Sequence, residues 1–376
     1  MANEVLKKGG EVASEVPGET SGFGFEGMRF GVKAWRASAS DARESGSPTV
    51  PIVLVHGFAQ QASTWDDTAH LLAGAGARCF GFELAGHGVG ACSAGGGSAE
   101  RSRFFDLRFQ ARALLTFCGA VACDAGAAPV LVGYSMGGRV ALQAACLAAD
   151  DLRDGELGRA ALGSSAAFAA CDRTGRLDVA GACQRDTATT SAGDAVRMSA
   201  AVPFSALVLE SAGLGPVDDA AREALRERNF AWAARVRGEG VSAFMDWWAG
   251  LPLFESQRKL ANEQRERLRA GRLANDTESL ALSFERAGAH AMPSQGESIR
   301  ALCELAAKGI PVSYLAGELD AKYCKVASTL QAESQGAISC RVVPAAGHNI
   351  HLEQSEAFNA ILGEVVESCT PKPAAL

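Results

Sequence analysis

The sequence predicts an α/β fold in which a mostly parallel central sheet is flanked by helices and carries a helical cap. Short apolar runs at 52–55, 129–132 and 206–209 are rich in branched residues, which is typical of strands buried on both faces of a parallel sheet. Helical stretches separate these runs, as the connections between parallel strands require. The segment at 217–295 is helical in pattern and lacks strand candidates, so it is expected to form the cap.

The order of segments along the chain predicts a core that is interrupted by the cap. The first residues are rich in Gly, Glu and Ser and are expected to be disordered, and residues 23–36 are expected to form a hairpin at the sheet edge. A later stretch, rich in Ala, Gly, Asp, Ser and Thr, is longer than the usual helix-to-strand connection. The expected divisions are an extension at 1–22, the first part of the core at 23–216 with an insertion at about 151–204, the cap at 217–295, the second part of the core at 296–368 and a tail at 369–376.

The most informative motif is Gly133-Tyr134-Ser135-Met136-Gly137, which follows an apolar run and precedes an alanine-rich helical segment. A serine on a sharp strand-to-helix turn needs small neighbours, because a Cβ at those positions would clash with nearby backbone. In this setting G-x-S-x-G is the pattern of the nucleophile elbow of α/β-hydrolase-fold enzymes. Ser135 is therefore the predicted catalytic serine.

A catalytic serine of this kind requires a histidine late in the chain and an acid between the two. His348 lies in a turn of small residues after a strand-like run, and Asp320 follows an earlier predicted strand. The order Ser135, Asp320, His348 is that of α/β-hydrolases. Glu210, at the end of another predicted strand, is the alternative acid, but the Gly-Glu-Leu-Asp setting favours Asp320.

A second oxyanion donor is expected on the segment His56-Gly57-Phe58, which directly follows a predicted strand. Glycine at this place lets the loop turn back over the serine. The backbone N–H of Phe58 is therefore a predicted oxyanion donor, together with that of Met136 at the start of the elbow helix. The histidines expected to be structural are His56, His87 and His351.

The composition argues against several classes of function. The chain has 376 residues, of which 48% are hydrophobic and 21% charged, and its net charge of −7 argues against a nucleic-acid partner. We find no uncharged apolar stretch of about eighteen residues, so no membrane span is expected. The 11 cysteines are scattered without metal-ligand spacing, which indicates core residues in a reducing cytoplasm and no metal site.

Further motifs make a resemblance to one family specific. In chain order they are H-G-F with a following Trp65, G-H-G at 86–88, G-Y-S-M-G-G-R at 133–139, L-E-S at 209–211, F-M-D-W-W at 244–248, P-L-F-E-S-Q at 252–257 and G-H-N-I-H-L-E at 347–353. Together they resemble the 2-succinyl-6-hydroxy-2,4-cyclohexadiene-1-carboxylate synthases, which are α/β-hydrolase-fold lyases of menaquinone biosynthesis. The resemblance covers about residues 50–150 and 205–365. Gln60 departs from the family pattern, in which a glycine is usual at this place.

The resemblance implies a lyase that needs no cofactor. The family removes pyruvate from 2-succinyl-5-enolpyruvyl-6-hydroxy-3-cyclohexene-1-carboxylate. By this resemblance Ser135 acts as a general base on a ring proton, and His348, oriented by Asp320, raises the basicity of the serine. The N–H groups of Phe58 and Met136 would hold the dienolate oxygen.

The three carboxylates of such a substrate require arginines, whose planar guanidinium groups bind carboxylates through paired hydrogen bonds. Arg139 lies four residues after the serine, and Arg272 matches a cap arginine of the family. Arg226 is the third candidate, and Arg222 and Arg228 are close alternatives because the register slips in this segment. The residues expected to bind the substrate are therefore Tyr134, Arg139, Arg226, Arg272 and Trp247.

Two other classes of function remain open from the sequence. A carboxylester or carbon–carbon bond hydrolase of the same fold would use the same triad, since fold does not fix chemistry. A neutral ester gains nothing from three buried guanidinium groups, so the arginines distinguish the two enzymes. The third class is a non-enzymatic scaffold, against which the complete set of triad residues argues.

Overall fold

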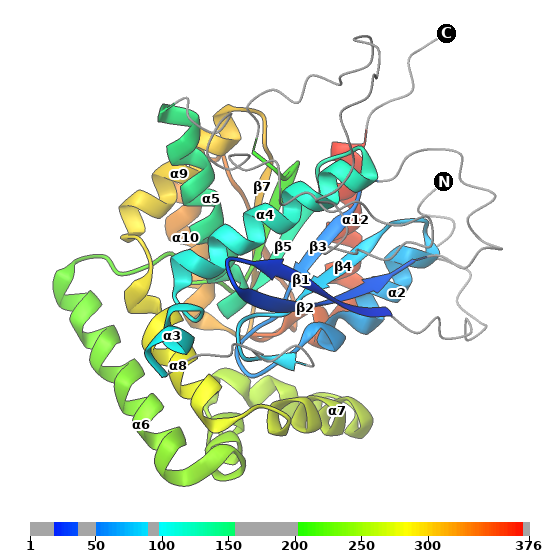
Figure 1. The fold of residues 1–376 in the computed structure, drawn as a ribbon. Helices are drawn as coiled ribbons and strands as arrows, with labels where there is room; N and C mark the ends of the chain where they lie inside the picture. The colour runs from blue at the N-terminus through cyan, green and yellow to red at the C-terminus, as the bar shows by residue number, and fades with distance from the viewer. Residues whose placement is uncertain (1–18, 37–49, 89–97, 155–201, 371–376) are drawn as a thin grey trace, which may run out of the picture.

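The computed structural model describes residues 19–36, 50–88, 98–154 and 202–370. These residues form one eight-stranded sheet with helices on both faces (Figure 1). The predicted α/β class with a mostly parallel sheet is confirmed. The strands are β1 (Glu19–Phe25), β2 (Met28–Trp35), β3 (Ile52–Val55), β4 (Cys79–Phe82), β5 (Val130–Tyr134), β6 (Ala206–Glu210), β7 (Val312–Gly317) and β8 (Ser339–Val343).

The strand order across the sheet is β1-β2-β4-β3-β5-β6-β7-β8. Strand β2 is antiparallel to β1 and β4, and the remaining pairings are parallel. Val55 pairs with Gly133, and Gly133 pairs with Leu209, so β3, β5 and β6 end at the same edge of the sheet. In open parallel sheets, this carboxyl edge is where ligands bind.

The helices connect the strands and form the cap. Several carry local end signals; Asp106, for example, accepts hydrogen bonds from the N–H groups of Arg108 and Phe109 at the start of α4. The α-helices are α2 (Asp66–Gly74), α3 (Ser98–Arg103), α4 (Leu107–Ala125), α5 (Met136–Asp154), α6 (Asp219–Ala249), α7 (Asn262–Leu273), α8 (Thr277–Ala287), α9 (Gln295–Ala307), α10 (Ala321–Glu333), α11 (Ile350–Glu353) and α12 (Ser355–Cys369), and the 3₁₀ helices are η2 (Ala62–Trp65), η4 (Pro252–Lys259) and η5 (Ala289–Ala291).

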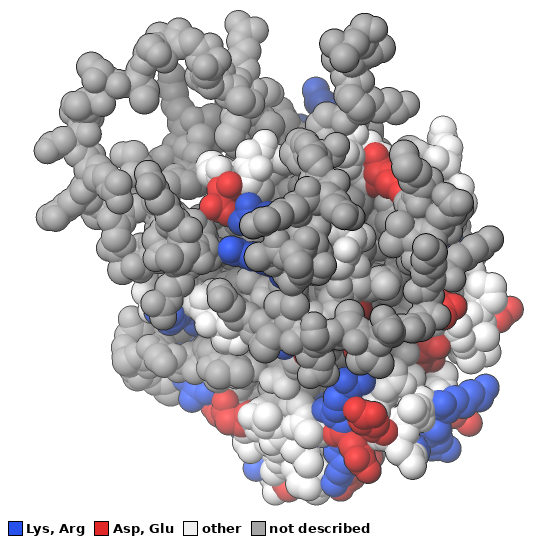
Figure 2. Space-filling model, turned by 90° about the vertical axis from the view of Figure 1, so that its right-hand side faces the viewer, with Lys and Arg blue, Asp and Glu red and all other residues white. Residues whose placement is uncertain are grey.

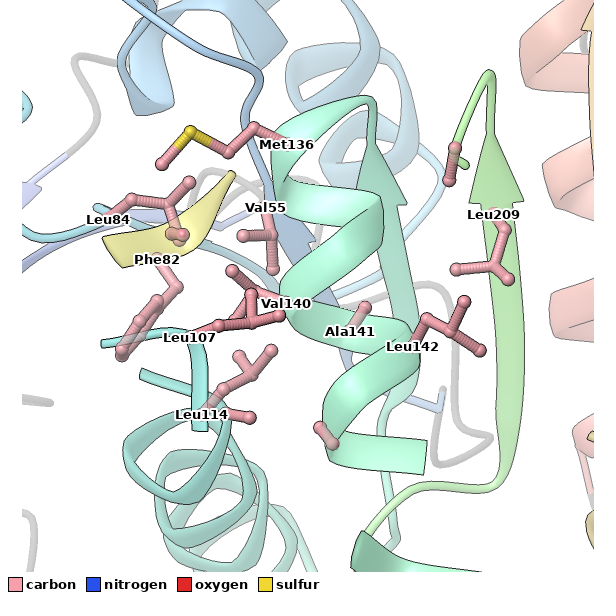
Figure 3. Packing of buried hydrophobic residues seen from close by; sticks show 14 of the residues in the cluster. Val55, Phe82, Leu84, Leu107, Leu114, Met136, Val140, Ala141, Leu142 and Leu209 are labelled. Carbon is pink, nitrogen blue, oxygen red and sulfur yellow. The ribbon is translucent and has the colours of Figure 1, made fainter. Parts of the chain in front are cut away.

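Alternation along the strands builds a core on each face of the sheet. Val53 and Val55 belong to the cluster that includes α4 and α5, whereas Ile52 and Leu54 belong to the cluster that includes α2 and α12. Figure 3 shows Val140 of α5 among core residues of the first cluster. Burying one such side chain stabilises the fold by about 1.5–3 kcal/mol, so both faces contribute to holding the site's edge in place.

The cap is built from α6, α7 and α8, which lie together at one end of the molecule (Figure 1). Helix α6 contains a break at Gly240, whose φ of 76° is outside the helical region. Aromatic side chains join the cap to the core: the ring of Phe58 lies 5.0 Å from that of Trp248 and 4.3 Å from that of Phe284. The cap therefore packs directly on the loop that follows β3.

The expected divisions can be compared with these elements only in part. The N-terminal hairpin begins at Glu19, four residues before the expected boundary. The expected insertion falls mainly on 155–201, and most of the expected extension and tail fall on 1–18 and 371–376, all of which lie outside the described residues. The domain divisions themselves stay predictions.

The charges on one face of the molecule are mixed, and the helices of the described residues are not of the kind that crosses a membrane. Figure 2 shows positive and negative side chains mixed over the described part of one face. Within the described ranges, the helices are all too short or too polar to cross a membrane.

Candidate active site

Ser135 occupies the sharp turn between β5 and α5. Its φ of 50° lies in the left-handed region, where a non-glycine residue is strained by roughly 1–3 kcal/mol. The N–H of Ser135 donates to the carbonyl oxygen of Glu210 at 2.9 Å, and its carbonyl oxygen accepts from the N–H of Arg139 at 3.1 Å. These two hydrogen bonds hold the strained serine at the carboxyl edge of the sheet.

Three glycines make room for this turn. A Cβ on Gly133 would lie 2.7 Å from the carbonyl oxygen of Gly137, and one on Gly138 would lie 2.6 Å from the Cβ of Ala212. A Cβ on Gly137 itself would lie 2.3 Å from the carbonyl oxygen of Val55. The small residues of the motif are therefore required by close approach on three sides.

The structure brings Ser135, His348 and Asp320 together as a hydrogen-bonded chain. The Oγ of Ser135 lies 3.0 Å from Nε2 of His348, and Nδ1 of His348 lies 2.8 Å from Oδ2 of Asp320. An ionised carboxylate can only accept, so Nδ1 carries the proton and Nε2 is free to accept from the serine hydroxyl. This is the arrangement in which histidine serves as a base toward the serine.

Asp320 is held in place by the helix that it starts. Its Oδ1 accepts from the N–H of Tyr323 at 3.2 Å as the N-cap of α10, which leaves Oδ2 for His348. Both members of the pair are buried, with side-chain exposures of 3% for Asp320 and 2% for His348. Water is thus excluded from the bond that orients the imidazole.

Glu210, the alternative acid, bonds a different histidine. Its Oε2 lies 2.7 Å from Nδ1 of His351, and its Oε1 accepts from the N–H of His351 at 3.1 Å. Asp320 and Glu210 therefore each hold one imidazole, and only Asp320 holds that of His348. The geometry accords with Asp320 as the acid that orients His348.

The loop after β3 approaches the serine as the sequence predicts. Gly57 is required there, because a Cβ would lie 2.6 Å from the ring of Tyr134. The carbonyl oxygen of Gly57 is held by Nδ1 of His56 at 2.8 Å and by the N–H of Gln60 at 3.2 Å. These bonds fix the peptide that joins Gly57 to Phe58, the peptide whose N–H is the expected oxyanion donor.

Gln60, which stands where the synthase family usually has glycine, does not disrupt this loop. Its side-chain Oε1 accepts from the N–H of Gly57 at 3.3 Å, and the residue is buried. The left-handed conformation that the turn needs falls on Ala59, with a φ of 56°. Gln60 thus replaces the usual glycine with a side chain that stabilises the turn.

Aromatic rings enclose the catalytic histidine. The ring centroids of Tyr134, Phe254 and Tyr323 lie 5.4, 5.8 and 4.9 Å from that of His348. Burial raises the pKa of Tyr134 well above its usual range, so its hydroxyl stays neutral. Phe254 and Tyr323 had no role in the sequence prediction; the P-L-F-E-S-Q motif at 252–257 was the available signal for Phe254.

Trp247 lies within the cap's aromatic cluster. It packs against Phe244 at 5.3 Å, and the guanidinium of Arg235 lies 4.0 Å from its ring centroid. Its neighbour Trp248 is the one that contacts Phe58, at 5.0 Å. The contacts of Trp247 support packing, and Trp248 is the tryptophan next to the oxyanion loop.

Three arginines lie near the triad without a carboxylate partner among the described residues. Burial lowers the pKa of Arg139 to about 10, and it also lowers the pKa values of Arg228 and Arg272. The hydroxyl of Tyr323 opposes this lowering of the pKa values of Arg139 and Arg228, and the ring of Tyr323 lies 4.9 Å from that of His348. Arg272 is buried, Arg139 is half-buried and Arg228 is exposed. All three differ from surface arginines such as Arg237, which pairs with two glutamates.

Arg272 has unused donors that face other buried groups. Its guanidinium lies 5.3 Å from the ring centroid of Phe254, and its Nη2 donates to Oε1 of Gln257 at 3.0 Å. Its Nε and the Nε2 of Gln257 are both buried without a hydrogen-bond partner among the described residues. Two orphaned donors beside a guanidinium are suited to an anionic ligand.

The remaining arginines of α6 are placed differently. Arg226, the expected third ligand, is exposed and pairs with Glu223 at 2.6 Å. Arg222 donates to the carbonyl oxygens of His290 and Met292 at 2.6 and 2.7 Å. The placement of Arg226 does not support a role in binding. Arg228, one of the two alternatives, is also exposed, but it has no carboxylate partner among the described residues and its guanidinium lies 4.6 Å from the ring centroid of Trp232.

Within the described residues, no group of three or more His, Cys, Asp and Glu side chains is arranged to hold a metal ion.

Known proteins resemble the chain at the levels of sequence and fold. The alpha/beta hydrolase family matches residues 52–361. A 2-succinyl-6-hydroxy-2,4-cyclohexadiene-1-carboxylate synthase of Salmonella newport is 28% identical over 309 residues, which cover 82% of this chain and 90% of that protein. A Bacillus subtilis protein given the same activity provisionally in its name is 33% identical over 166 residues, which cover 44% of this chain and 57% of that protein.

Among solved structures, MenH from S. aureus superposes with a TM-score of 0.62 at 22% identity, covering 90% of this chain and 98% of that one. An esterase from Thermogutta terrifontis superposes with a TM-score of 0.57 at 18% identity, covering 94% and 100%. At these identities both structures establish the fold alone. The predicted resemblance to the synthases is confirmed, and the chain belongs to the alpha/beta hydrolase family.

Proposed function

We propose that this protein is a lyase that eliminates pyruvate from 2-succinyl-5-enolpyruvyl-6-hydroxy-3-cyclohexene-1-carboxylate, giving 2-succinyl-6-hydroxy-2,4-cyclohexadiene-1-carboxylate. The names of its relatives support this reaction, and the hydrogen-bonded Ser135, His348 and Asp320 supply a base for it. The proposal needs no cofactor.

The observation that carries the proposal is the set of arginines Arg139, Arg228 and Arg272. A guanidinium buried without a counter-charge is destabilising by several kcal/mol, so a fold keeps such groups where a ligand supplies the charge. Arg272 is buried, Arg139 is half-buried and Arg228 is exposed, and together they match in number the three carboxylates of the substrate. Arg272 lies on the Phe254 side of His348, while the hydroxyl of Tyr323 opposes the lowering by burial of the pKa values of Arg139 and Arg228.

The reaction starts at Ser135. His348 accepts the hydroxyl proton through Nε2 as Ser135 Oγ removes a proton from the ring carbon, and Asp320 stabilises the imidazolium that forms. The N–H groups of Phe58 and Met136 hold the oxygen on which negative charge develops. The electron pair of the broken C–H bond forms a double bond to the neighbouring ring carbon, the existing ring double bond shifts by one position, and the C–O bond to the enolpyruvyl group breaks, which completes a 1,4-elimination. The released enolate of pyruvate takes up a proton.

A carboxylester or carbon–carbon bond hydrolase is the alternative. The 3.0 Å contact between Ser135 Oγ and His348 Nε2 equips the serine for nucleophilic attack as well as for proton removal. The triad does not separate the two reactions, but a neutral ester leaves all three arginines without a partner.

The test is steady-state kinetics of pyruvate release for Arg139→Ala and Arg272→Ala. Each substitution is expected to reduce kcat/KM about 10- to 150-fold, the loss of one hydrogen-bonded charge pair. Arg153→Ala is the matched control, because Arg153 lies on the same helix as Arg139 but is exposed and pairs with Glu304 at 2.8 Å. Arg228→Ala and Arg226→Ala then identify the arginine of α6 that serves the substrate, with the larger loss expected for Arg228.

An ester hydrolase would behave in the opposite way. Folded Arg139→Ala and Arg272→Ala proteins that turn over an aryl ester at the wild-type rate, with pyruvate release no faster than the enzyme-free blank, would favour the hydrolase. The blank is needed because the substrate also loses pyruvate without an enzyme.

A further inference from the structure

His351 and Glu210 form a second buried imidazole–carboxylate pair, which the proposed reaction does not use. Glu210 at the end of β6 accepts two hydrogen bonds from one residue, the backbone N–H of His351 at 3.1 Å and its ring Nδ1 at 2.7 Å. The side chains of Glu210 and His351 are 0% and 1% exposed. A carboxylate this deeply buried depends on its donors, and both of them belong to His351.

Aromatic rings fix the imidazole of His351 on several sides. The indole of Trp65 stacks on it with ring centroids 3.8 Å apart and an interplanar angle of 22°. The rings of Tyr134 and Phe358 approach it edge-on at 5.0 and 5.8 Å. The imidazole therefore has one orientation, in which Nδ1 faces Glu210.

The pair is connected to both catalytic residues. Glu210 accepts the N–H of Ser135 through its backbone carbonyl at 2.9 Å, so one residue bonds the elbow by its main chain and His351 by its side chain. His351 lies three residues after His348, in the short helix α11 that ends the segment at 347–353. The ring of Tyr134 is close to both imidazoles, 5.4 Å from that of His348 and 5.0 Å from that of His351.

The segment at 347–353 also has hydrogen bonds within itself. Glu353 accepts from the N–H of Gly347 at 2.7 Å through Oε2 and from the N–H of Asn349 at 3.1 Å through Oε1. These bonds shape the segment locally, but they lie within it. The bond between His351 and Glu210 is the one that ties the segment to the strand beside the elbow.

We propose that Glu210 and His351 are positioning residues for the catalytic histidine: their buried pair fixes the segment at 347–353 to the end of β6 and so holds His348 Nε2 within reach of Ser135 Oγ. The inference rests on the Ser135–His348 chemistry of the proposed function but not on the identity of the substrate. It assigns a role to the acid that the sequence offered only as an alternative triad member.

The test compares two substitutions of His351. His351→Phe keeps an aromatic ring against Trp65 but removes the Nδ1 donor, whereas His351→Asn places an amide N–H where Nδ1 was and can still donate to Glu210. Displacements of about 1 Å in a catalytic site cost roughly 100-fold in rate, so His351→Phe is expected to lower kcat at least ~10-fold with KM nearly unchanged. His351→Asn is expected to stay within about threefold of wild type, as rescue by a conservative variant requires.

A second readout does not depend on the substrate. A fluorophosphonate reacts with the serine by forming an Oγ–P bond and breaking the P–F bond, with the hydroxyl proton passing to His348 and fluoride leaving. Its second-order rate constant reports the Ser135–His348 pair directly. The rate constant is expected to fall in His351→Phe by about the same factor as kcat and to be retained in His351→Asn.

Leu114→Ala is the control for lost stability, because Leu114 is fully buried in the cluster that includes α4 and α5, whereas the rings around His351 belong to the cluster that includes α2 and α12. Should His351→Phe prove unable to fold, Glu210→Leu and Glu210→Gln form a parallel comparison. Glutamine keeps one acceptor oxygen for the backbone N–H of His351, and its amide N–H can donate to Nδ1 of the other imidazole tautomer. Folded His351→Phe or Glu210→Leu protein with wild-type kcat and wild-type phosphonylation would overturn the inference. Wild-type protein that is phosphonylated but releases no pyruvate would instead count against the proposed function alone.

Discussion

Gly137 and Val55 approach each other so closely that a Cβ on Gly137 would lie 2.3 Å from the carbonyl oxygen of Val55. A Cβ there would also lie 2.5 Å from the carbonyl oxygen of His56. The start of α5 and the end of β3 are therefore in contact through backbone alone. This contact brings the two expected oxyanion donors, on Phe58 and Met136, to adjacent turns.

Gly137→Ala is expected to destabilise the protein and to lower activity, because neither partner is a flexible side chain that can move away. Overpacking of this kind costs about 1–3 kcal/mol. Gly363→Ala is the matched control, since Gly363 lies in helix α12 with open space around it. The control is expected to be neutral or to stabilise by about 0.5–1 kcal/mol. Urea unfolding of both variants measures the difference, and equal stabilities would contradict the close contact.

Asp320→Asn tests which acid orients the catalytic histidine. An amide at this position no longer holds Nδ1 of His348 as the donor, so the tautomer that serves Ser135 is lost and kcat is expected to fall about 10³- to 10⁴-fold. Thermal unfolding checks that the variant is folded. A folded Asp320→Asn protein with near wild-type kcat would transfer the role of triad acid to Glu210, the other carboxylate with a buried histidine partner.

Acid stability depends on His87, whose imidazole is buried beside the oxyanion loop. Burial, reinforced by His56, lowers its pKa from 6.5 to about 3, while its contact with Ala85 and the charge of Asp276 oppose the shift. The unfolded chain then binds a proton that the folded chain does not, so stability is lost as the pH falls from about 6.5 toward 3.

Between pH 7 and pH 5 this linkage amounts to a loss of about 2 kcal/mol. His87→Asn keeps an N–H that can donate to the carbonyl oxygen of Ala85 but removes the titrating group. Wild type is therefore expected to lose about 2 kcal/mol more than His87→Asn over this range in urea unfolding. Parallel pH profiles for the two proteins would show that His87 titrates normally in the fold.

The strands and the meeting of Ser135, Asp320 and His348 could be predicted from the sequence because each depends on local signals. Apolar runs such as 52–55 specify buried strands, and the turn at Ser135 demands glycines whatever surrounds it. Parallel strands end at a common edge, so residues directly after them gather even when they are far apart in the chain. This is why Asp320 and His348 could be chosen before their contact at 2.8 Å was seen.

The inward-facing residues of the cap were harder to predict from the sequence, because neighbouring positions on a helix point about 100° apart. On α6, Arg226 pairs with Glu223 on the surface, whereas Arg228, two residues later, lies over the ring of Trp232 at 4.6 Å. For the same reason the sequence did not show that Trp248, and not its neighbour Trp247, contacts Phe58. Sequence spacing gives the residue types on such a helix but not the angle at which the helix faces the core.

Glu210 illustrates a further limit. A carboxylate at a strand end, with two histidines on the segment opposite, has two possible partners, and sequence order alone does not choose between them. The choice depends on the stacking of His351 against Trp65, a contact between residues that are far apart in the chain.

The most direct measurement of the central claim is pyruvate release from the purified protein and its Ser135→Ala variant with 2-succinyl-5-enolpyruvyl-6-hydroxy-3-cyclohexene-1-carboxylate, followed through lactate dehydrogenase. A lyase with Ser135 as its base is expected to release pyruvate well above the enzyme-free blank as wild type and at the blank rate as folded Ser135→Ala. Release at the blank rate for both proteins, together with hydrolysis of an aryl ester by the wild type alone, would contradict the lyase and establish a hydrolase.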